Sequence, residues 1–406
     1  MSRLNLEKLK TIFTSEYWLI ASLCGAFFSF FALNRGGVVV FIDACIIFLF
    51  INFISGKYRL KDIPASYWVT VAICGYLLGA SVLFNPKTSH YRWMTYMVRM
   101  LGVVFAIHCL SSKSIKDWVV TFFCIVPAVA VGWQAVAFYV FKMPFGTFSN
   151  PHYLSSFSVL TIPAIVYSVI VTKGWYKFLF VPAVLLDLDL LLRIGSRPAI
   201  LGLTAGSLFV AVFLIKGWWK WIGLLLILVG LSGLYFSGYE GVYSRFEELI
   251  VKLPKEERVY LWTASLDMLR DNSVTTWIFG SGIGNVRTVY PQYIPQMSHL
   301  IFPHLHFIEV LHDNGIVGAI LLFGGLSLLF IWSIRFSKST GDKNSRIFLQ
   351  CLLVSFIGWL IHSGLTFPFY SKYSQYSLAF ILGTLLTVLE YPAKPKNKRL
   401  LSQMCA

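Results

Sequence analysis

The residues of this sequence that could do chemistry are arginines and histidines in or beside long apolar segments, where ionisable side chains are costly. Arg193 and Arg197 are the first and fifth residues of the segment Arg-Ile-Gly-Ser-Arg-Pro. This segment follows an apolar run that contains Asp187 and Asp189. Asp189 and Arg193 are four residues apart and would pair on one helix face. Arg197 precedes a proline that suits the first turn of another helix. A guanidinium there could grip a phosphate with two parallel hydrogen bonds, and the alternative is an arginine that merely reaches the membrane interface.

Other arginines occur in two places. Arg92 and Arg99 are seven residues apart and would share a helix face, either to neutralise a lipid phosphate or to hydrogen-bond another helix. Arg245 and Arg258 lie in a long polar stretch, and Arg258 begins the segment Arg-Val-Tyr-Leu-Trp. Two glutamates precede Arg258, so a surface salt bridge is the alternative to a binding role.

Histidines gather where the polar stretch ends. His304, His306 and His312 accompany Glu309 within residues 303–318. A neutral histidine beside a hydroxyl can act as a general base near neutral pH, and a structural histidine is the alternative. His304 and His306 would not share a face of a regular helix. No HExxH or similar spacing occurs, so the histidines give little support for a zinc site.

Two turn-rich segments carry weaker signals. Residues 146–152 favour a plain loop. Residues 280–284, Gly-Ser-Gly-Ile-Gly, only superficially resemble a nucleotide-binding loop, because no predicted strand precedes them. The seven cysteines include no CxxC pair, which argues against a zinc site or a disulfide framework.

The composition indicates the elements that must position these residues. The chain has 406 residues, of which 57% are hydrophobic and 13% charged, and its mean hydropathy is +0.70. Soluble domains carry about 25% charged residues, so a membrane protein is favoured. The net charge of +16 would suggest nucleic-acid binding in a soluble protein, but no basic face interleaved with exposed aromatic residues is apparent. We therefore expect an all-α, polytopic membrane helix bundle.

Apolar runs near the length of about 20 residues that crosses a bilayer predict about twelve transmembrane helices. Basic residues concentrate in alternate loops and in both termini, which places the termini in the cytoplasm by the positive-inside rule. The N-terminal run lacks an evident cleavage site and is expected to be an uncleaved first span. The expected spans cover residues 17–33, 37–55, 66–84, 94–110, 118–141, 154–172, 178–194, 198–215, 219–237, 314–334, 347–367 and 375–390.

One polar stretch interrupts the spans and would lie on the periplasmic side. It should contain helices near residues 242–253 and 256–270. Long loops with structure of their own are usually functional, and the alternative is a passive cap. The expected organisation is transmembrane helices 1–9 in residues 1–237, a large periplasmic loop in 238–305, transmembrane helices 10–12 in 306–390 and a basic cytoplasmic tail in 391–406.

The layout and these motifs together resemble the O-antigen ligase and polymerase superfamily of bacterial envelope glycosyltransferases. Ser-Arg-Pro resembles the family's Thr/Ser-Arg at the start of a span and points to Arg197. Arg-Val-Tyr-Leu-Trp resembles its loop-helix arginine and points to Arg258. The family's histidine heads the pattern His-Asn, a Leu-rich helix and Gly-x-x-Gly, and counting back from Gly315 gives His304. In this sequence Leu305 stands where the family pattern has asparagine, and a second histidine, His306, comes next. Which of these two histidines corresponds to the family's histidine therefore stays open.

The resemblance implies an inner-membrane enzyme that takes a glycan from undecaprenyl diphosphate without metal or nucleotide. Arg197 and Arg258 would hold the diphosphate, and His304 would deprotonate the acceptor hydroxyl at a periplasmic active site. Further substrate contacts would come from Arg99, Arg193, Arg245 and His306. We favour a ligase whose acceptor is the lipid A-core oligosaccharide.

Three alternatives follow from the same sequence. A polymerase elongating lipid-linked repeat units has the same motifs. A protein-glycosylating enzyme would usually carry a larger outer region. A transporter of lipid-linked glycans would predict broken helices and repeated halves, and the sequence shows no internal repeat.

Overall fold

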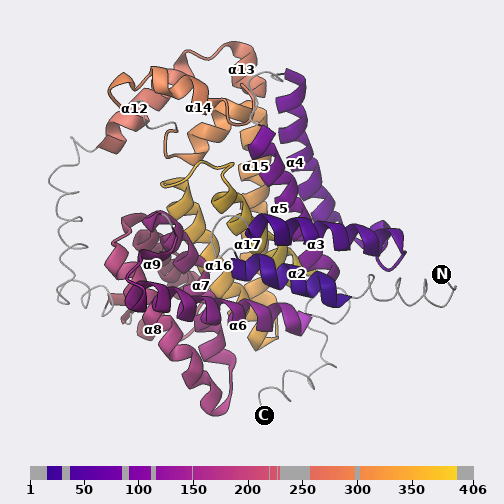
Figure 1. The fold of residues 1–406 in the computed structure, drawn as a ribbon, viewed down its shortest axis with the longest axis vertical. Helices are drawn as coiled ribbons and strands as arrows, with labels where there is room; N and C mark the ends of the chain where they lie inside the picture. Colours follow the sequence, from indigo (N-terminus) through magenta and orange to yellow (C-terminus); the bar gives the residue numbers. More distant parts are fainter. Residues whose placement is uncertain are drawn as a thin grey trace.

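The computed structural model describes residues 16–29, 37–84, 91–110, 116–148, 150–218, 220–225, 227–228, 257–297 and 302–390. Within these ranges the chain is predominantly helical, with one short strand, β1 (Pro144–Thr147). The predicted α-helical class is therefore confirmed (Figure 1).

Long apolar helices form a bundle. Three short one-turn elements, η2 (Leu60–Asp62), η4 (Val136–Val140) and η5 (Gly174–Tyr176), adjoin it. The bundle helices are α2 (Glu16–Phe28), α3 (Gly37–Ile54), α4 (Ala65–Phe84), α5 (Tyr91–Leu110), α6 (Lys116–Ala135), α7 (Pro151–Val171), α8 (Lys177–Ile194), α9 (Arg197–Phe213), α15 (His306–Ser339), α16 (Lys343–Gly364) and α17 (Lys372–Glu390).

Several of these helices suit a bilayer. Among the described residues, α4, α5, α7, α15 and α16 are long and apolar enough to cross one, and α2, α3, α6 and α9 contain shorter apolar segments. A helix occupies the place of each expected span except 219–237, most of which lies outside the described residues. These helices support integration into a membrane.

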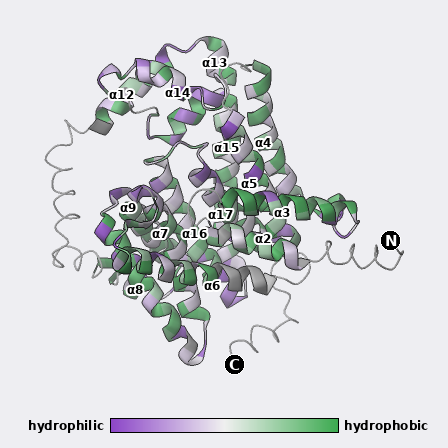
Figure 2. Ribbon diagram, viewed as in Figure 1, coloured by the Kyte–Doolittle hydropathy of each residue, from purple (hydrophilic) through white to green (hydrophobic). Residues whose placement is uncertain are grey.

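A second layer of short helices covers one end of the bundle (Figure 1). We call it the cap: α12 (Glu257–Arg270), α13 (Val274–Phe279), α14 (Val286–Val289), η7 (Tyr290–Gln292) and η8 (Pro295–Met297). Figure 2 shows more hydrophilic colouring in the cap than in the bundle. α12 confirms the helix expected at 256–270, whereas the one expected at 242–253 lies outside the described residues.

One tyrosine fastens the cap internally. The Tyr290 side chain is fully buried, and its hydroxyl donates to the carbonyl of Leu261 on α12 at 2.8 Å. Burial raises the pKa of Tyr290 to about 12. The neutral phenol thus joins η7 to α12.

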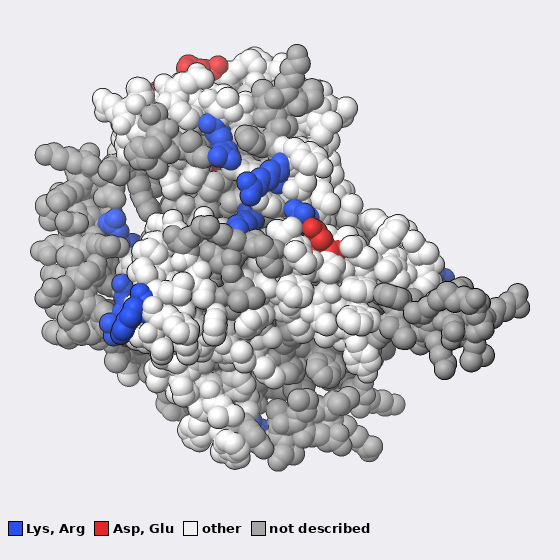
Figure 3. Space-filling model, viewed as in Figure 1, with Lys and Arg blue, Asp and Glu red and all other residues white. Residues whose placement is uncertain are grey.

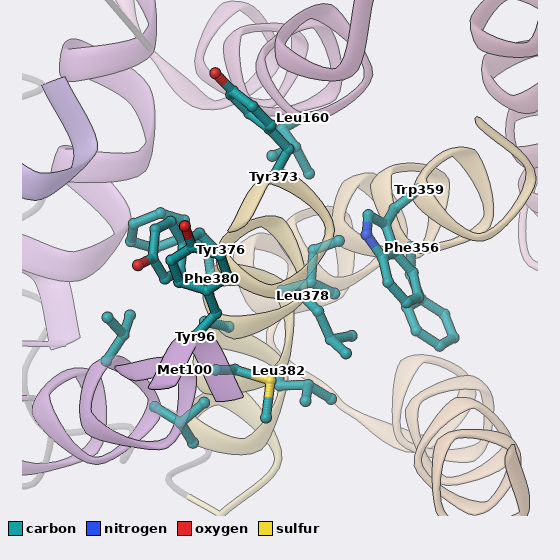
Figure 4. Packing of buried hydrophobic residues seen from close by; sticks show 14 of the residues in the cluster. Tyr96, Met100, Leu160, Phe356, Trp359, Tyr373, Tyr376, Leu378, Phe380 and Leu382 are labelled. Carbon is teal, nitrogen blue, oxygen red and sulfur yellow. The ribbon is translucent and has the colours of Figure 1, made fainter. Parts of the chain in front are cut away.

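The centre of the bundle is α17, which is buried along almost its whole length. Aromatic rings of neighbouring helices pack on it, as Figure 4 shows for Tyr96 beside Tyr376, whose ring centroids are 5.9 Å apart. Trp359 of α16 donates its indole N–H to the carbonyl of Ser374 at 3.2 Å. Aromatic burial and this buried hydrogen bond keep α17 in register with α5 and α16.

Helices α9 and α16 approach each other through glycine. A Cβ atom on Gly202 would lie 2.8 Å from the carbonyl oxygen of Gly358, and one on Gly206 would lie 2.9 Å from that of Val354. Glycines four residues apart let helix backbones touch in membranes. This contact sets the height of α9, and therefore of Arg197 at its first position.

Candidate functional site

The cap is held on the bundle by two glycine segments. Helix α15 is kinked at Gly315, whose φ of 67° and ψ of −177° are not helical. The kink leaves the carbonyls of His312 and Asp313 available to partners outside the helix. They accept hydrogen bonds from the backbone N–H groups of Ser281 and Gly282, each at 2.9 Å. The cap's glycine turn, residues 280–284, therefore docks on the kink through backbone hydrogen bonds.

Neither side of this contact has room for a side chain. A Cβ on Gly280 would lie 2.2 Å from the carbonyl oxygen of Asp313, and one on Gly315 would lie 2.3 Å from that of Ile278. Gly280 also has φ 87° and ψ 176°, a conformation that essentially only glycine adopts. The glycine turn is thus a structural lock.

Two polar residues beside the kink strengthen the lock. The buried carboxylate of Asp313 accepts from the backbone N–H groups of Gly284 at 2.6 Å and Val286 at 3.0 Å, at the start of α14. The Asn314 side chain donates to the carbonyl of Leu77 on α4 at 3.2 Å and accepts from the hydroxyl of Tyr370. Asp313 and Asn314 therefore join the cap, α4 and the loop before α17.

Positive charge gathers beneath the cap. Arg287 on α14 is half-buried, with its guanidinium 5.2 Å from the ring centroid of Trp93 on α5. Burial and then the charge of Arg92 lower the pKa of Arg287, while Glu309 partly offsets them. The buried Glu309 carboxylate accepts from the backbone N–H of Phe369 at 2.7 Å. Figure 3 shows Lys and Arg side chains gathered on one face between the cap and the bundle.

His304 lies at the junction between the cap and α15. It is half-buried, and its φ is 54°. Its Nδ1 is 3.1 Å from the carbonyl oxygen of Thr366. Because a carbonyl oxygen can only accept, Nδ1 must carry the proton, which leaves Nε2 as the nitrogen able to take one up. This contact therefore selects the tautomer that a base requires.

His306 occupies a different environment. It is the first residue of α15, and only 3% of it is exposed. Its ring centroid lies 5.2 Å from that of Phe369 and 5.9 Å from that of Trp359. His306 is therefore part of the bundle interior, whereas His304 stands at its rim.

The arginine segment before α9 has the predicted helical pair. Arg193 donates to the Asp189 carboxylate at 2.9 Å and to the hydroxyl of Tyr139 at 3.2 Å. Arg197 is half-buried at the first position of α9. Asp187 points into the bundle, where it accepts hydrogen bonds from Ser158 and Thr161. The two aspartates thus have separate roles, one orienting Arg193 and one joining α8 to α7.

The remaining candidates are dispersed. Arg99 makes two hydrogen bonds to the Asp43 carboxylate on α3, at 2.7 and 2.9 Å. Arg258 is the second residue of α12, and Arg245 lies outside the described residues. In the loop before α7, the Asn150 side chain caps the helix by accepting from the N–H of His152.

No cluster of three or more His, Cys, Asp or Glu side chains in the described part of the chain is arranged to hold a metal ion. The chemistry that the described groups offer is proton transfer at His304 and anion binding by guanidinium groups. Sequence reasoning missed Arg287. Its only local signal is its position three residues after the glycine turn.

Residues 182–323 match the family model described as O-antigen ligase. This segment is therefore similar to an O-antigen ligase domain. It begins within α8, ends within α15 and includes Arg197, the glycine turn and His304. The predicted resemblance is thereby confirmed. A comparison with curated protein sequences finds no match.

The O-antigen ligase family contains glycosyltransferase-like enzymes, both ligases and polymerases. Its members act on lipid-linked glycans in a membrane. The described part of the domain brings the cap, the kink of α15 and His304 together at one end of the bundle.

Proposed function

We propose that this protein is an O-antigen ligase, an inverting glycosyltransferase that moves a glycan from undecaprenyl diphosphate to the lipid A-core oligosaccharide. It would span the bacterial inner membrane about twelve times, with cytoplasmic termini and a periplasmic active site beneath the cap. The observation that carries the proposal is the contact of His304 Nδ1 with the Thr366 carbonyl, which leaves Nε2 to act as the base.

The reaction would proceed by direct displacement. His304 Nε2 takes the proton of an acceptor hydroxyl, and the oxygen attacks the anomeric carbon of the donor sugar. The bond from that carbon to the diphosphate oxygen breaks, its electron pair leaves with the diphosphate, and the configuration inverts. Diphosphate is already a good leaving group, so cationic contacts suffice to stabilise the developing charge.

The resemblance assigns those contacts to Arg197 and Arg258. A further contribution from Arg287 and Arg92 is supported by the electrostatic effect of Arg92, whose charge lowers the pKa of Arg287. Like-charged guanidinium groups held near each other favour an anion between them. Arg193, Arg245 and His306 remain proposed substrate contacts.

Arg99 receives a different assignment. Its guanidinium already matches the two oxygens of Asp43 in parallel hydrogen bonds. These hydrogen bonds occupy the pair of parallel N–H groups that could otherwise bind a phosphate. We therefore propose that Arg99 mainly joins α5 to α3, and that its loss lowers stability more than donor binding.

The first test is the lipopolysaccharide profile of a deletion strain complemented with wild type, His304→Ala or His306→Gln. A ligase predicts bare core and polymer accumulating on the lipid carrier in the deletion strain. His304→Ala should fail to restore ligation, with a loss of roughly 10²- to 10⁴-fold in rate for the purified enzyme, while His306→Gln retains more activity.

Other outcomes would redirect the proposal. Core capped with a single repeat unit in the deletion strain would identify a polymerase. Carrier-linked glycan trapped in the cytoplasmic leaflet would identify a transporter. Greater loss in His306→Gln than in His304→Ala would move the base to His306.

A further inference from the structure

An apolar cavity opens in the bundle and extends from the level of the α15 kink, at Leu77 and Phe369, towards the end opposite the cap. It has a volume of about 400 Å³ and lies between α4, α5, α15 and α17. Met100 of α5 and Leu382 of α17, both labelled in Figure 4, form part of its wall. Leu326 and Leu329 of α15 line the opposite side. Such a lining suits a hydrocarbon chain and offers little to a polar ligand.

The side of the cavity is accessible to lipid. Leu328, Ile331 and Trp332 line it and are also 70%, 43% and 37% exposed. Side chains that line a cavity and also face the surrounding bilayer mark an opening between helices. A lipid chain can therefore enter laterally, without passing the cap.

One charged residue marks the far end of the cavity. Among the described lining residues, Arg335 alone is charged. It follows the Gly315 kink by twenty residues, which is about 30 Å along a helix and roughly the thickness of a hydrocarbon core. Arg335 thus stands at the opposite membrane boundary from the kink and the cap.

Glu390, the last residue of α17, has a hydrogen-bond partner on α4. Ser66, which also lines the cavity, donates its hydroxyl to Glu390 at 2.6 Å. Arg335 is exposed, and it both lines the cavity and lies at the water boundary. A guanidinium in that place complements a phosphate whose own hydrocarbon chain fills the cavity.

We propose that this cavity binds an acyl chain of an anionic phospholipid from the leaflet opposite the cap, with the lipid phosphate on Arg335. The glycan donor fits less well. Its diphosphate must lie at the cap end beside His304, and its tail would bring no phosphate to Arg335. A phospholipid would fill the apolar part of the cavity with its acyl chain and place its phosphate on Arg335. It would thereby join α15 to α4 on the membrane side of the candidate active site.

The binding test uses delipidated full-length protein in detergent, titrated with phosphatidylglycerol or phosphatidylcholine and followed by native mass spectrometry. Wild type should retain phosphatidylglycerol preferentially. Arg335→Gln should weaken that binding about 5-fold, equivalent to about 1 kcal/mol, as expected for one basic residue near an anionic headgroup. Lys338→Gln removes a charge from the same end of α15 outside the cavity and should change binding less than 2-fold.

A second pair of variants tests the chain-binding wall. Thr70→Phe would fill the cavity, whereas Ala72→Phe adds a similar ring on the exposed side of the same helix. Thr70→Phe should reduce phosphatidylglycerol retention at least 5-fold, and Ala72→Phe should leave it unchanged.

Three results would overturn the proposal. They are equal weakening by Arg335→Gln and Lys338→Gln, equal retention of the two phospholipids, or displacement of bound lipid by undecaprenyl phosphate but not by phosphatidylglycerol. Lipid retention is measured without glycosyl transfer, so these results are independent of the proposed enzyme activity.

Discussion

Replacing Gly280 with alanine should loosen the cap from the bundle. The new Cβ would lie 2.2 Å from the Asp313 carbonyl oxygen and 2.4 Å from the Asn314 backbone nitrogen. Both neighbours are backbone atoms of the kink in α15, so no flexible side chain can move aside. Relief requires the glycine turn to withdraw, which lengthens the hydrogen bonds from Ser281 and Gly282 to the kink.

The cost can be estimated from two contributions. A non-glycine residue at φ 87° and ψ 176° costs about 1–3 kcal/mol. Inserting a carbon into a filled contact costs typically about 1–3 kcal/mol. We expect a loss of at least about 2 kcal/mol, which lowers the apparent melting temperature by roughly 2 °C or more.

A thiol-reactive dye can report this loss. Cys45 and Cys109 are buried in the bundle and would react only when it opens. Gly324→Ala is the matched control on α15, because a Cβ there meets nothing within 4 Å. It should leave the melting temperature unchanged or raise it, because alanine stabilises a helix interior by about 0.5–1 kcal/mol relative to glycine. Equal stability of Gly280→Ala and wild type would refute the lock.

Three further predictions address other contacts. Gly202→Leu should cost about 1–3 kcal/mol by separating α9 from α16, measured as earlier dye labelling, and an unchanged labelling temperature would contradict it. Arg287→Gln should lower kcat/KM for the lipid-linked donor about 10-fold or more, because it removes a charge that stabilises the leaving diphosphate, and an unchanged kcat/KM would exclude Arg287 from the diphosphate contacts. The pKa of Tyr290, raised to about 12 in the fold against about 10 in an unfolded chain, contributes stability that is present below pH 10 and lost as pH rises towards 12. Protease resistance of the cap should fall over that range in wild type, and the fall should be smaller in Tyr290→Phe.

Local patterns in the sequence were sufficient for much of the architecture. Apolar runs predicted the bundle helices, because covering a bilayer core demands long apolar stretches. The helix α12 and the pair of Asp189 with Arg193 also follow from spacing within a few residues. The count of spans and the cytoplasmic position of the termini remain predictions from the same patterns.

The candidate site was only partly predictable. The family pattern singled out Arg197 and His304 but left His304 and His306 as alternatives. The fold gives them different surroundings, since it buries His306 against Phe369 and brings Thr366 to His304. Sequence spacing had suggested Arg99 for a phosphate, and the tertiary structure pairs it with Asp43.

The sequence by itself determined which segments are apolar and which residue types are available for proton transfer and anion binding. The tertiary structure decided which of them meet. The contact of Gly280 with Asp313, the effect of the Arg92 charge on Arg287 and the contact of His304 with Thr366 each join residues far apart in the chain. No local propensity encodes such contacts, because they form only when packing has brought the helices together.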